Sequence, residues 1–195
     1  MHLALSASRI ATRIDVHPLV DAIAARPHLW ALRTLRQDYP GSPHADTQAI
    51  CLRLPENALT CPRDLQEDLT ATATPECAQL WEPLQGVFLP LLRALRVSRL
   101  GRAVIVRLPA GGQVAEHVDQ GAYAKTYSRF HLVLASTMGF RFSVGEEVHS
   151  MAPGECWWFD HRQTHSARNE GPGDRISLIF DVQTPWFTVG GQDEP

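Results

Sequence analysis

The sequence of 195 residues predicts an α+β fold, with helices in the first half of the chain and short β-strands in the second. Two observations support this prediction. Before residue 101, apolar residues recur at the spacing of one helix face. After Gly101, runs rich in Val, Ile, Phe and Trp are separated by glycine turns, which is typical of a β-sandwich or barrel. The length suits one hydrophobic core, so we expect a single domain over residues 1–195.

The first half contains two clear helical patterns. Asp15 is expected to cap a helix that ends before Pro27, with Val16, Leu19, Val20 and Ile23 on one face. Pro83 and Pro90 are expected to start, kink or split a later helix that begins near Pro75. Its apolar positions are Leu80, Leu84, Val87, Phe88, Leu91 and Leu95. Between these patterns we expect a short helix over 28–37, a loop over 39–47 and a strand over 49–55.

Eight strand-like segments follow Gly101, at 102–112, 113–121, 127–139, 140–145, 146–154, 155–161, 164–173 and 174–183. Strands at this spacing, each ending in a turn, favour an antiparallel jelly roll, a cupin-like double-stranded β-helix. We therefore expect a helical support region (1–100) packed on a jelly-roll core (101–183), followed by a tail (184–195). Trp157 and Trp158 are expected to face opposite sides of their strand, and "GAYAKTYS", with Tyr123 and Tyr127, to form a lid or a mobile surface loop.

Composition argues against several classes of protein. The formal net charge is −3 and no basic run is present, so nucleic acid is not an expected partner. No apolar run approaches the ~20 residues of a membrane span, and Arg9 and Arg13 interrupt the start too early for a secretory signal. The four cysteines, Cys51, Cys61, Cys77 and Cys156, form no C-x-x-C pair. We expect them to be reduced thiols in a cytoplasmic protein.

The stretch "AEHVDQGAY" suggests a metal site. Residues i and i+2 of a strand share a face, so His117 and Asp119 can offer an imidazole and a carboxylate to one ion. His165 is the best candidate for a third ligand, with His161 as its competitor. Two histidines and a carboxylate form the facial triad of non-haem Fe(II) oxygenases, which leaves coordination positions open. The pattern is not specific by itself, because a second His-x-Asp occurs at His44 and Asp46 in an expected loop. These two residues have either a capping or surface role or a role in contacting substrate.

Candidate carboxylate anchors surround this motif in the sequence. Ten residues after His165, Arg175 and Ser177 share a face of the last strand, where a guanidinium and a hydroxyl can hold a dicarboxylic keto acid by its far end. An ordinary ion pair with Asp174 or Asp181 is the other interpretation of Arg175. Arg129 and His131 form a second cationic pair on an earlier strand. Arg107 fits a substrate contact and a charge at the barrel rim equally well.

The arrangement "HVD … SRFHL … GECWWFD … H … DRISLIFD" resembles the aspartyl/asparaginyl β-hydroxylase-like family of Fe(II)/2-oxoglutarate-dependent oxygenases. The resemblance covers roughly residues 101–183, and "SPHADTQAICLRLP" is similar to the family's preceding segment. It implies that Fe(II) binds to His117, Asp119 and His165. It also implies that Arg175 binds the distal carboxylate of 2-oxoglutarate, with His131 and Arg129 near the co-substrate.

The presence of Asp119 narrows the expected chemistry. Animal aspartyl hydroxylases of this family lack the carboxylate ligand, so the chain is more similar to the family's free-amino-acid hydroxylases. A halogenase requires a small residue at this position. The resemblance implies hydroxylation of an unactivated C–H bond, with O2 and an amino acid, amino-acid-like molecule or peptidyl residue as substrates. The alternatives are a cupin-like protein that binds metal and ligand without turnover, and a zinc hydrolase with Glu116 as its base.

Overall fold

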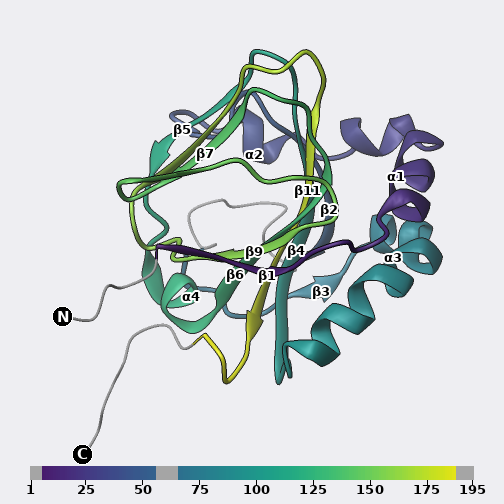
Figure 1. Cartoon of the computed structure of the whole chain (residues 1–195). Helices are drawn as coiled ribbons and strands as arrows, with labels where there is room; N and C mark the ends of the chain where they lie inside the picture. The colour runs from purple at the N-terminus through teal and green to yellow at the C-terminus, as the bar shows by residue number, and fades with distance from the viewer. Residues whose placement is uncertain (1–5, 56–65, 188–195) are drawn as a thin grey trace, which may run out of the picture.

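The computed structural model describes residues 6–55 and 66–187, which form two β-sheets with helices on the outer face of the larger one (Figure 1). The eight strands predicted after Gly101 are all present. Three further strands come from the first half of the chain, where the sequence suggested mostly helix. The first of them, β1 (Ala7–Ala11), pairs with β9 (Cys156–Phe159) at one edge of the larger sheet, and this long-range pairing is what makes the segment a strand.

Both sheets are antiparallel. The larger sheet has the order β1-β9-β6-β11-β4-β2-β3, and the smaller has the order β5-β10-β7-β8. The remaining strands of the larger sheet are β2 (Gln48–Leu54), β3 (Thr72–Ala73), β4 (Arg99–Leu108), β6 (Ser128–Ala135) and β11 (Arg175–Gln183). Those of the smaller sheet are β5 (Gln113–His117), β7 (Phe140–Val144), β8 (Glu147–His149) and β10 (His165–Asn169). Two facing antiparallel sheets with helices on one side fit the predicted α+β jelly roll.

The helices differ from the predictions in detail. The first, α1 (His17–Ala24), has Val16 rather than Asp15 at its N-cap, because the Asp15 carboxylate accepts the N–H of the first helical residue, 3.1 Å away. The prediction of a single helix over 28–37 is wrong. The segment is divided into a 3₁₀ helix, η1 (Pro27–Ala31), and a single turn, α2 (Leu35–Asp38). The break lies at Arg33, whose guanidinium binds Glu76 at O–N distances of 2.7 and 3.1 Å.

The long helix α3 (Pro75–Ala94) continues through both of its internal prolines. Thr74 caps it by accepting the N–H of Cys77. Its predicted apolar face is buried throughout. The segment with Tyr123 and Tyr127 is not a mobile surface loop, because it contains a short helix, α4 (Gly121–Thr126), and its tyrosine rings stack at 4.5 Å between centroids and are almost completely buried. Its expected role as a lid over the site stays a prediction.

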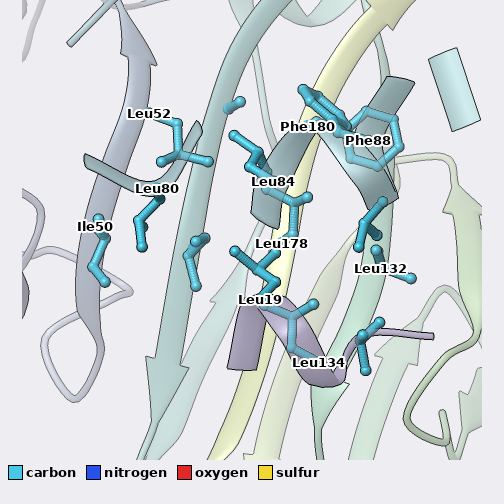
Figure 2. Packing of buried hydrophobic residues seen from close by; sticks show 14 of the residues in the cluster. Leu19, Ile50, Leu52, Leu80, Leu84, Phe88, Leu132, Leu134, Leu178 and Phe180 are labelled. Atoms are coloured by element: carbon cyan, nitrogen blue, oxygen red, sulfur yellow. The ribbon is translucent and has the colours of Figure 1, made fainter. Parts of the chain in front are cut away.

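Strands of the larger sheet bury both faces, and alternate residues serve different purposes. In β11, Leu178, Phe180 and Val182 pack with α1 and α3 (Figure 2), whereas Arg175 and Ser177 point into the space between the sheets. The same division holds in β6, and in β9 it puts Trp158 with the helices and Trp157 between the sheets, as predicted. A second cluster fills the space between the sheets with residues that include Val133, Phe140, Phe142, Val144 and Phe159.

Among the described residues, no helix is long and apolar enough to cross a membrane. Cys51, Cys77 and Cys156 are free thiols, and Cys61 lies outside the described residues. Most of the predicted C-terminal tail also lies outside them.

Candidate functional site

Strand pairing in the smaller sheet brings the two predicted histidine ligands together. His117 at the end of β5 lies directly opposite His165 at the start of β10, with 4.2 Å between ring centroids. Asp119 follows two residues after β5 has ended, so it does not share a strand with His117 as the sequence suggested. Its backbone N–H donates to the carbonyl of His161 at 3.0 Å, which holds it beside the pair. One donor atom from each of His117, Asp119 and His165 lies within 4.8 Å of the others.

Backbone carbonyls orient both imidazoles. The Nδ1 atom of His117 donates to Ala115 O at 2.8 Å, and that of His165 donates to Gln163 O at 2.9 Å. In this tautomer each Nε2 keeps a free lone pair, as in metal-binding histidines whose other ring nitrogen donates to a backbone carbonyl. Burial lowers the pKa of His165 to about 4 and also lowers the pKa of His117, so both rings are neutral at pH 7.

His161, the competing candidate for the third ligand, is not part of this cluster of donor atoms. Its ring is 2% exposed, and Nε2 donates to Ala124 O at 3.0 Å. Its backbone carbonyl, rather than its ring, contacts Asp119.

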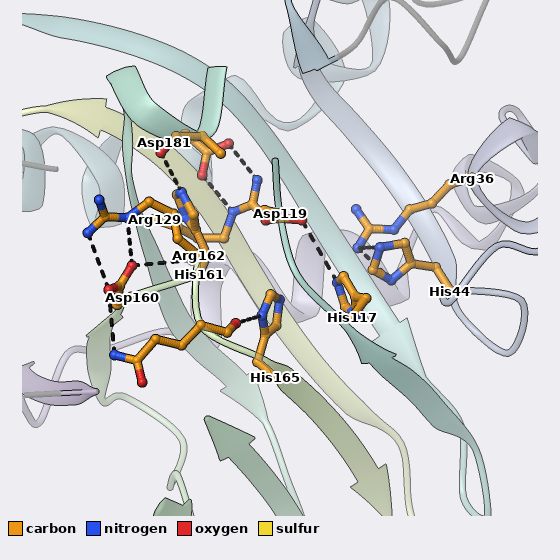
Figure 3. A network of polar contacts seen from close by, with 12 residues as sticks. Arg36, His44, His117, Asp119, Arg129, Asp160, His161, Arg162, His165 and Asp181 are labelled. Atoms are coloured by element: carbon orange, nitrogen blue, oxygen red, sulfur yellow. Dashed lines mark hydrogen bonds and ion pairs between the residues drawn. The ribbon is translucent and has the colours of Figure 1, made fainter. Parts of the chain in front are cut away.

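Arg129 joins Asp119 to a second aspartate (Figure 3). Its guanidinium forms an ion pair with Oδ2 of Asp119 and binds Asp181 in a bidentate manner, with N–O distances of 2.8 and 3.0 Å. Burial alone would raise the pKa of Asp119, but Arg129 and the nearby histidines outweigh it and lower the value to about 2. Asp119 is therefore an anion at every pH at which the protein is expected to work.

An inner pocket of about 70 Å³ lies between the sheets, next to the histidine pair. Arg175, 3% exposed, is at its base. Its Nε donates to Ser177 Oγ at 3.0 Å, and Nη1 donates to Ser136 Oγ at 3.1 Å and to Met151 O at 2.7 Å. Burial lowers the pKa of Arg175 to about 9, so it stays cationic at neutral pH. Within the described chain it pairs with no carboxylate, which removes the ordinary ion pair with Asp174 or Asp181 as an explanation.

His131 also lines the inner pocket and packs edge-to-face on Phe159, with 4.8 Å between centroids. Burial, together with Arg129 and Arg175, lowers the pKa of His131 well below its ordinary value. It therefore adds a neutral polar group, not a second cation, to this pocket.

A larger cavity of about 840 Å³ lies on the other side of the metal-ligand candidates. His117 and Arg129 line both spaces, so the cluster of His117, Asp119 and His165 stands at their junction. Apolar side chains such as Leu32, Val104 and Ile179 line the larger cavity, and Tyr123 of α4 also lines it. This arrangement can hold a small acid in the inner pocket and a second molecule outside.

The loop over 39–47 reaches this site. His44 contacts His117 edge-to-face at 4.9 Å between centroids and lines both cavities, while Asp46 accepts the backbone N–H of Gln113 at 3.0 Å. Arg107 lies elsewhere. It donates to Gln48 Oε1 at 2.7 Å and covers the Trp30 ring, which fits a structural charge near the barrel rim.

Sequence reasoning missed three residues of the site: Arg36, Ser136 and Asp181. Asp181 has the same strand parity as Arg175 and Ser177, so the alternation of β11 was an available signal. Arg36 and Ser136 come from segments that only tertiary folding brings here, and the sequence contains no local signal for them.

The geometry agrees with what comparison with known proteins gives. Residues 66–185 match the model of the aspartyl/asparaginyl beta-hydroxylase family, which is more than half of the chain. The chain belongs to this family. The family assignment made from the sequence motifs is therefore confirmed.

One curated relative of this family member is an L-proline cis-4-hydroxylase from Rhizobium meliloti (strain 1021), 29% identical over 83 residues. That match covers 43% of this chain and 30% of the relative's length. A crystal structure of an oxidoreductase of the 2OG-Fe(II) oxygenase family from Burkholderia pseudomallei is 15% identical, with a TM-score of 0.57 over 95% of this chain and 88% of that one. This likeness confirms the predicted fold.

Proposed function

We propose that the protein is an Fe(II)- and 2-oxoglutarate-dependent dioxygenase that hydroxylates an unactivated C–H bond of an amino acid, an amino-acid-like small molecule or a peptidyl residue. The observation that carries this proposal is the cluster of His117, Asp119 and His165, whose donor atoms lie within 4.8 Å of one another at the junction of two cavities. The family assignment and the curated proline hydroxylase support the same class of reaction.

The donor set fits Fe(II). Two neutral imidazoles with free Nε2 atoms and one carboxylate form a 2-His-1-carboxylate set, which is typical of non-haem iron oxygenases. Iron, when bound with 2-oxoglutarate and O2, supplies C–H hydroxylation coupled to decarboxylation of 2-oxoglutarate to succinate and CO2. The protein's own groups orient the ligands, neutralise charge and exclude water.

Arg175 and Ser177 would hold the distal carboxylate of 2-oxoglutarate in the inner pocket. The guanidinium is buried, cationic and has no carboxylate partner among the described residues, so a carboxylate ligand would supply its missing counter-charge. Ser136, on the other side of the guanidinium, offers a further hydroxyl. His131 and Arg129 would face the co-substrate between this anchor and the metal.

The two alternatives make different demands on the site. A zinc hydrolase needs a general base at the metal-bound water, and Glu116 is exposed, on the opposite side of β5 from His117. A cupin-like binding protein without turnover does not need Arg175, whereas here this arginine is buried with four contacts. Both observations favour the oxygenase.

The free thiols of Cys51, Cys77 and Cys156 support a cytoplasmic location, because such compartments keep cysteines reduced. The net charge of −3 supports a small substrate rather than nucleic acid as partner. The family match and the fold support one domain for the whole chain.

The test is an anaerobic titration of the protein with Fe(II) and then 2-oxoglutarate, followed by visible spectroscopy. We expect a charge-transfer band that disappears in His165→Ala and needs far more 2-oxoglutarate in Arg175→Ala. This test requires no knowledge of the primary substrate. Folded, iron-loaded protein without a band would reject the oxygenase and favour the cupin-like alternative.

A further inference from the structure

Arg36, in the turn α2, belongs to neither the proposed metal ligands nor the proposed 2-oxoglutarate anchor. Its side chain lines both cavities, beside His44, His117 and Arg129. Among the described residues, its guanidinium forms hydrogen bonds only with the His44 ring, where Nη2 lies 3.2 Å from Nδ1. Its Nε atom is buried and has no acceptor among these residues. A guanidinium carries five N–H donors, so most of its hydrogen-bonding capacity is unused.

Two other arginines that line the larger cavity are matched by carboxylates. Arg33 binds Glu76, and Arg129 binds both Asp119 and Asp181. In the described part of the chain, Arg36 has no carboxylate within 4.0 Å, and in this it is like Arg175. A cation that faces a cavity and has no counter-ion is unfavourable to the extent that it is shielded from water, and a ligand that brings the negative charge relieves this cost.

His44 does not neutralise Arg36. An imidazole carries no negative charge, so the His44 ring offers the guanidinium a hydrogen-bond acceptor but no counter-charge. His44 contacts both Arg36 and His117, so the guanidinium is one imidazole ring away from a proposed iron ligand (Figure 3).

The remaining lining of the larger cavity suits an acid with a short apolar body. Leu32, Val104 and Ile179 are apolar, and the two aspartates that line the cavity are already bound by Arg129. Because both aspartates already bind Arg129, and among the described residues neither forms an ion pair with Arg36, the Arg36 guanidinium is available to a ligand.

We propose that Arg36 binds the carboxylate of the primary substrate, and that this substrate is a small molecule with a free carboxylate, an amino acid or a related acid, not an internal residue of a polypeptide. This assignment rests on the proposed oxygenase function. It assigns Arg175 and Arg36, which pair with no carboxylate among the described residues, to two different acids: Arg175 takes the co-substrate in the inner pocket, and Arg36 takes the substrate in the larger cavity. The reacting carbon is then a few bonds from the carboxylate, because only one imidazole separates Arg36 from the iron ligand.

The experiment is isothermal titration calorimetry of full-length protein loaded with Mn(II) and 2-oxoglutarate, in which no turnover takes place. The probes are the twenty L-amino acids, their amides, acetate and propionate. We expect at least one acid to bind and its amide to bind at least about tenfold more weakly, because the amide loses a charge-assisted hydrogen bond. Arg36→Gln should lose the same factor for the acid, and Arg36→Lys should be intermediate, because lysine keeps the charge without the planar fork.

Arg175→Gln is the matched control, since it removes the other arginine that pairs with no carboxylate among the described residues. It should weaken 2-oxoglutarate binding, whereas Arg36→Gln should leave 2-oxoglutarate affinity and the melting temperature unchanged or higher. If Arg36→Gln weakens 2-oxoglutarate instead, the arginine belongs to the co-substrate and the proposal is overturned. Equal binding of acid and amide, or no binding by any acid while 2-oxoglutarate binds, also overturns it.

A failure of the proposed oxygenase function would give a different result: the wild-type protein would not bind 2-oxoglutarate at all. If Arg36→Gln does not fold, Arg36→Lys decides the matter, and unchanged affinity of that variant for the acid overturns the assignment.

Discussion

Arg129 organises the site at the scale of single residues. It engages Oδ2 of Asp119, and Oδ1 of the same carboxylate lies 3.9 Å from Nε2 of His117. One oxygen is thus held by the protein and the other faces the proposed metal. Asp181 holds Arg129 by two hydrogen bonds from across the strand pair β6–β11, in which these two residues are direct partners. Arg129 would therefore orient Asp119 as a metal ligand and leave one of its carboxylate oxygens available.

Replacement of Asp181 by Asn should weaken metal binding without removing a ligand. Asparagine cannot accept two charged hydrogen bonds, so Arg129 loses its fixed position and Asp119 loses its orientation. We expect Mn(II) affinity to fall by about 10-fold or more, as for other outer-shell partners of metal ligands. Calorimetric titration of the metal-free protein measures this.

Asp160→Asn is the control for Asp181→Asn, because Asp160 binds Arg162 at 2.8 Å and lines neither of the two site cavities. Its Mn(II) affinity should equal that of the wild type. A folded Asp181→Asn protein with wild-type affinity would show that Asp119 is oriented by its backbone contact with His161 alone.

What sequence can predict at the residue scale depends on how local the signal is. His117 and Asp119 are two positions apart, and His165 and Arg175 begin consecutive strands, so both pairs are visible as local motifs in the sequence although Asp119 lies beyond the end of β5. The three ligand candidates do meet in space, although metal binding stays a prediction. Arg36 reaches the site through a break in the helical pattern at Arg33, and that break depends on an ion pair with Glu76 of a distant helix.

At the scale of elements, the strands were more predictable than the helices. The strands after Gly101 are short runs rich in Val, Ile, Phe and Trp that are bounded by turns, and this pattern repeats eight times. The prediction of one helix over 28–37 was wrong because local spacing contains no information on tertiary contacts. The mobile-loop interpretation of the segment with Tyr123 and Tyr127 was wrong because both rings are buried. Pro83 and Pro90 did not divide α3, because one face of that helix is buried along its whole length.

Gly86 gives a direct test of α3. It lies on the exposed side of the helix, and a Cβ atom there meets no other atom within 4 Å. Gly86→Ala should therefore raise the free energy of unfolding by about 0.5–1 kcal/mol, since alanine loses less backbone entropy in a helix. Urea denaturation measures the change.

Gly41→Ala is the matched comparison, because its Cβ also meets nothing within 4 Å but its φ is +78°. Alanine is strained in the left-handed region, so this variant should lose about 1 kcal/mol. Changes of the same sign in both variants would contradict the assignment of Gly86 to a regular helix.

The ion pair at the start of α3 should make stability depend on pH. Burial raises the pKa of Glu76, but the hydrogen bonds from Arg33 outweigh burial and the folded-state pKa lies below its ordinary value. The carboxylate thus contributes stability above the unfolded-state pKa of about 4.3, and this contribution is lost as the pH falls through the folded-state pKa. Glu76→Gln should cost about 1–3 kcal/mol at neutral pH, with a difference from wild type that shrinks below about pH 4.3.

Urea denaturation at a series of pH values tests this, with Glu82→Gln on the exposed side of α3 as control. Glu82→Gln should match the wild type at each pH. A Glu76→Gln deficit that stays constant down to acidic pH would assign its effect to packing rather than to charge.

At the scale of the whole molecule, stability and binding occupy opposite faces of the larger sheet. The outer face packs on α1 and α3 through Leu19, Leu84 and Phe180 (Figure 2), and the inner face supplies Arg175, Ser177 and Arg129 to the site. The smaller sheet contributes the histidine pair. Metal and co-substrate would therefore bridge the two sheets, and their binding should stabilise the fold as a unit.

We expect 2-oxoglutarate to raise the melting temperature only when metal is present, because it needs both the chelated ion and the Arg175 anchor. A ligand at 100 times its Kd stabilises the folded state by about 2.7 kcal/mol. For a chain of this size about 2–4 °C corresponds to each kcal/mol, so the shift should be about 5–11 °C. Differential scanning fluorimetry with Mn(II) measures it, and Arg175→Gln should respond to Mn(II) but not to 2-oxoglutarate, whereas His165→Ala should respond to neither. A full 2-oxoglutarate shift in metal-free protein would mean that the acid binds to one sheet alone, and the bridging arrangement would then be wrong.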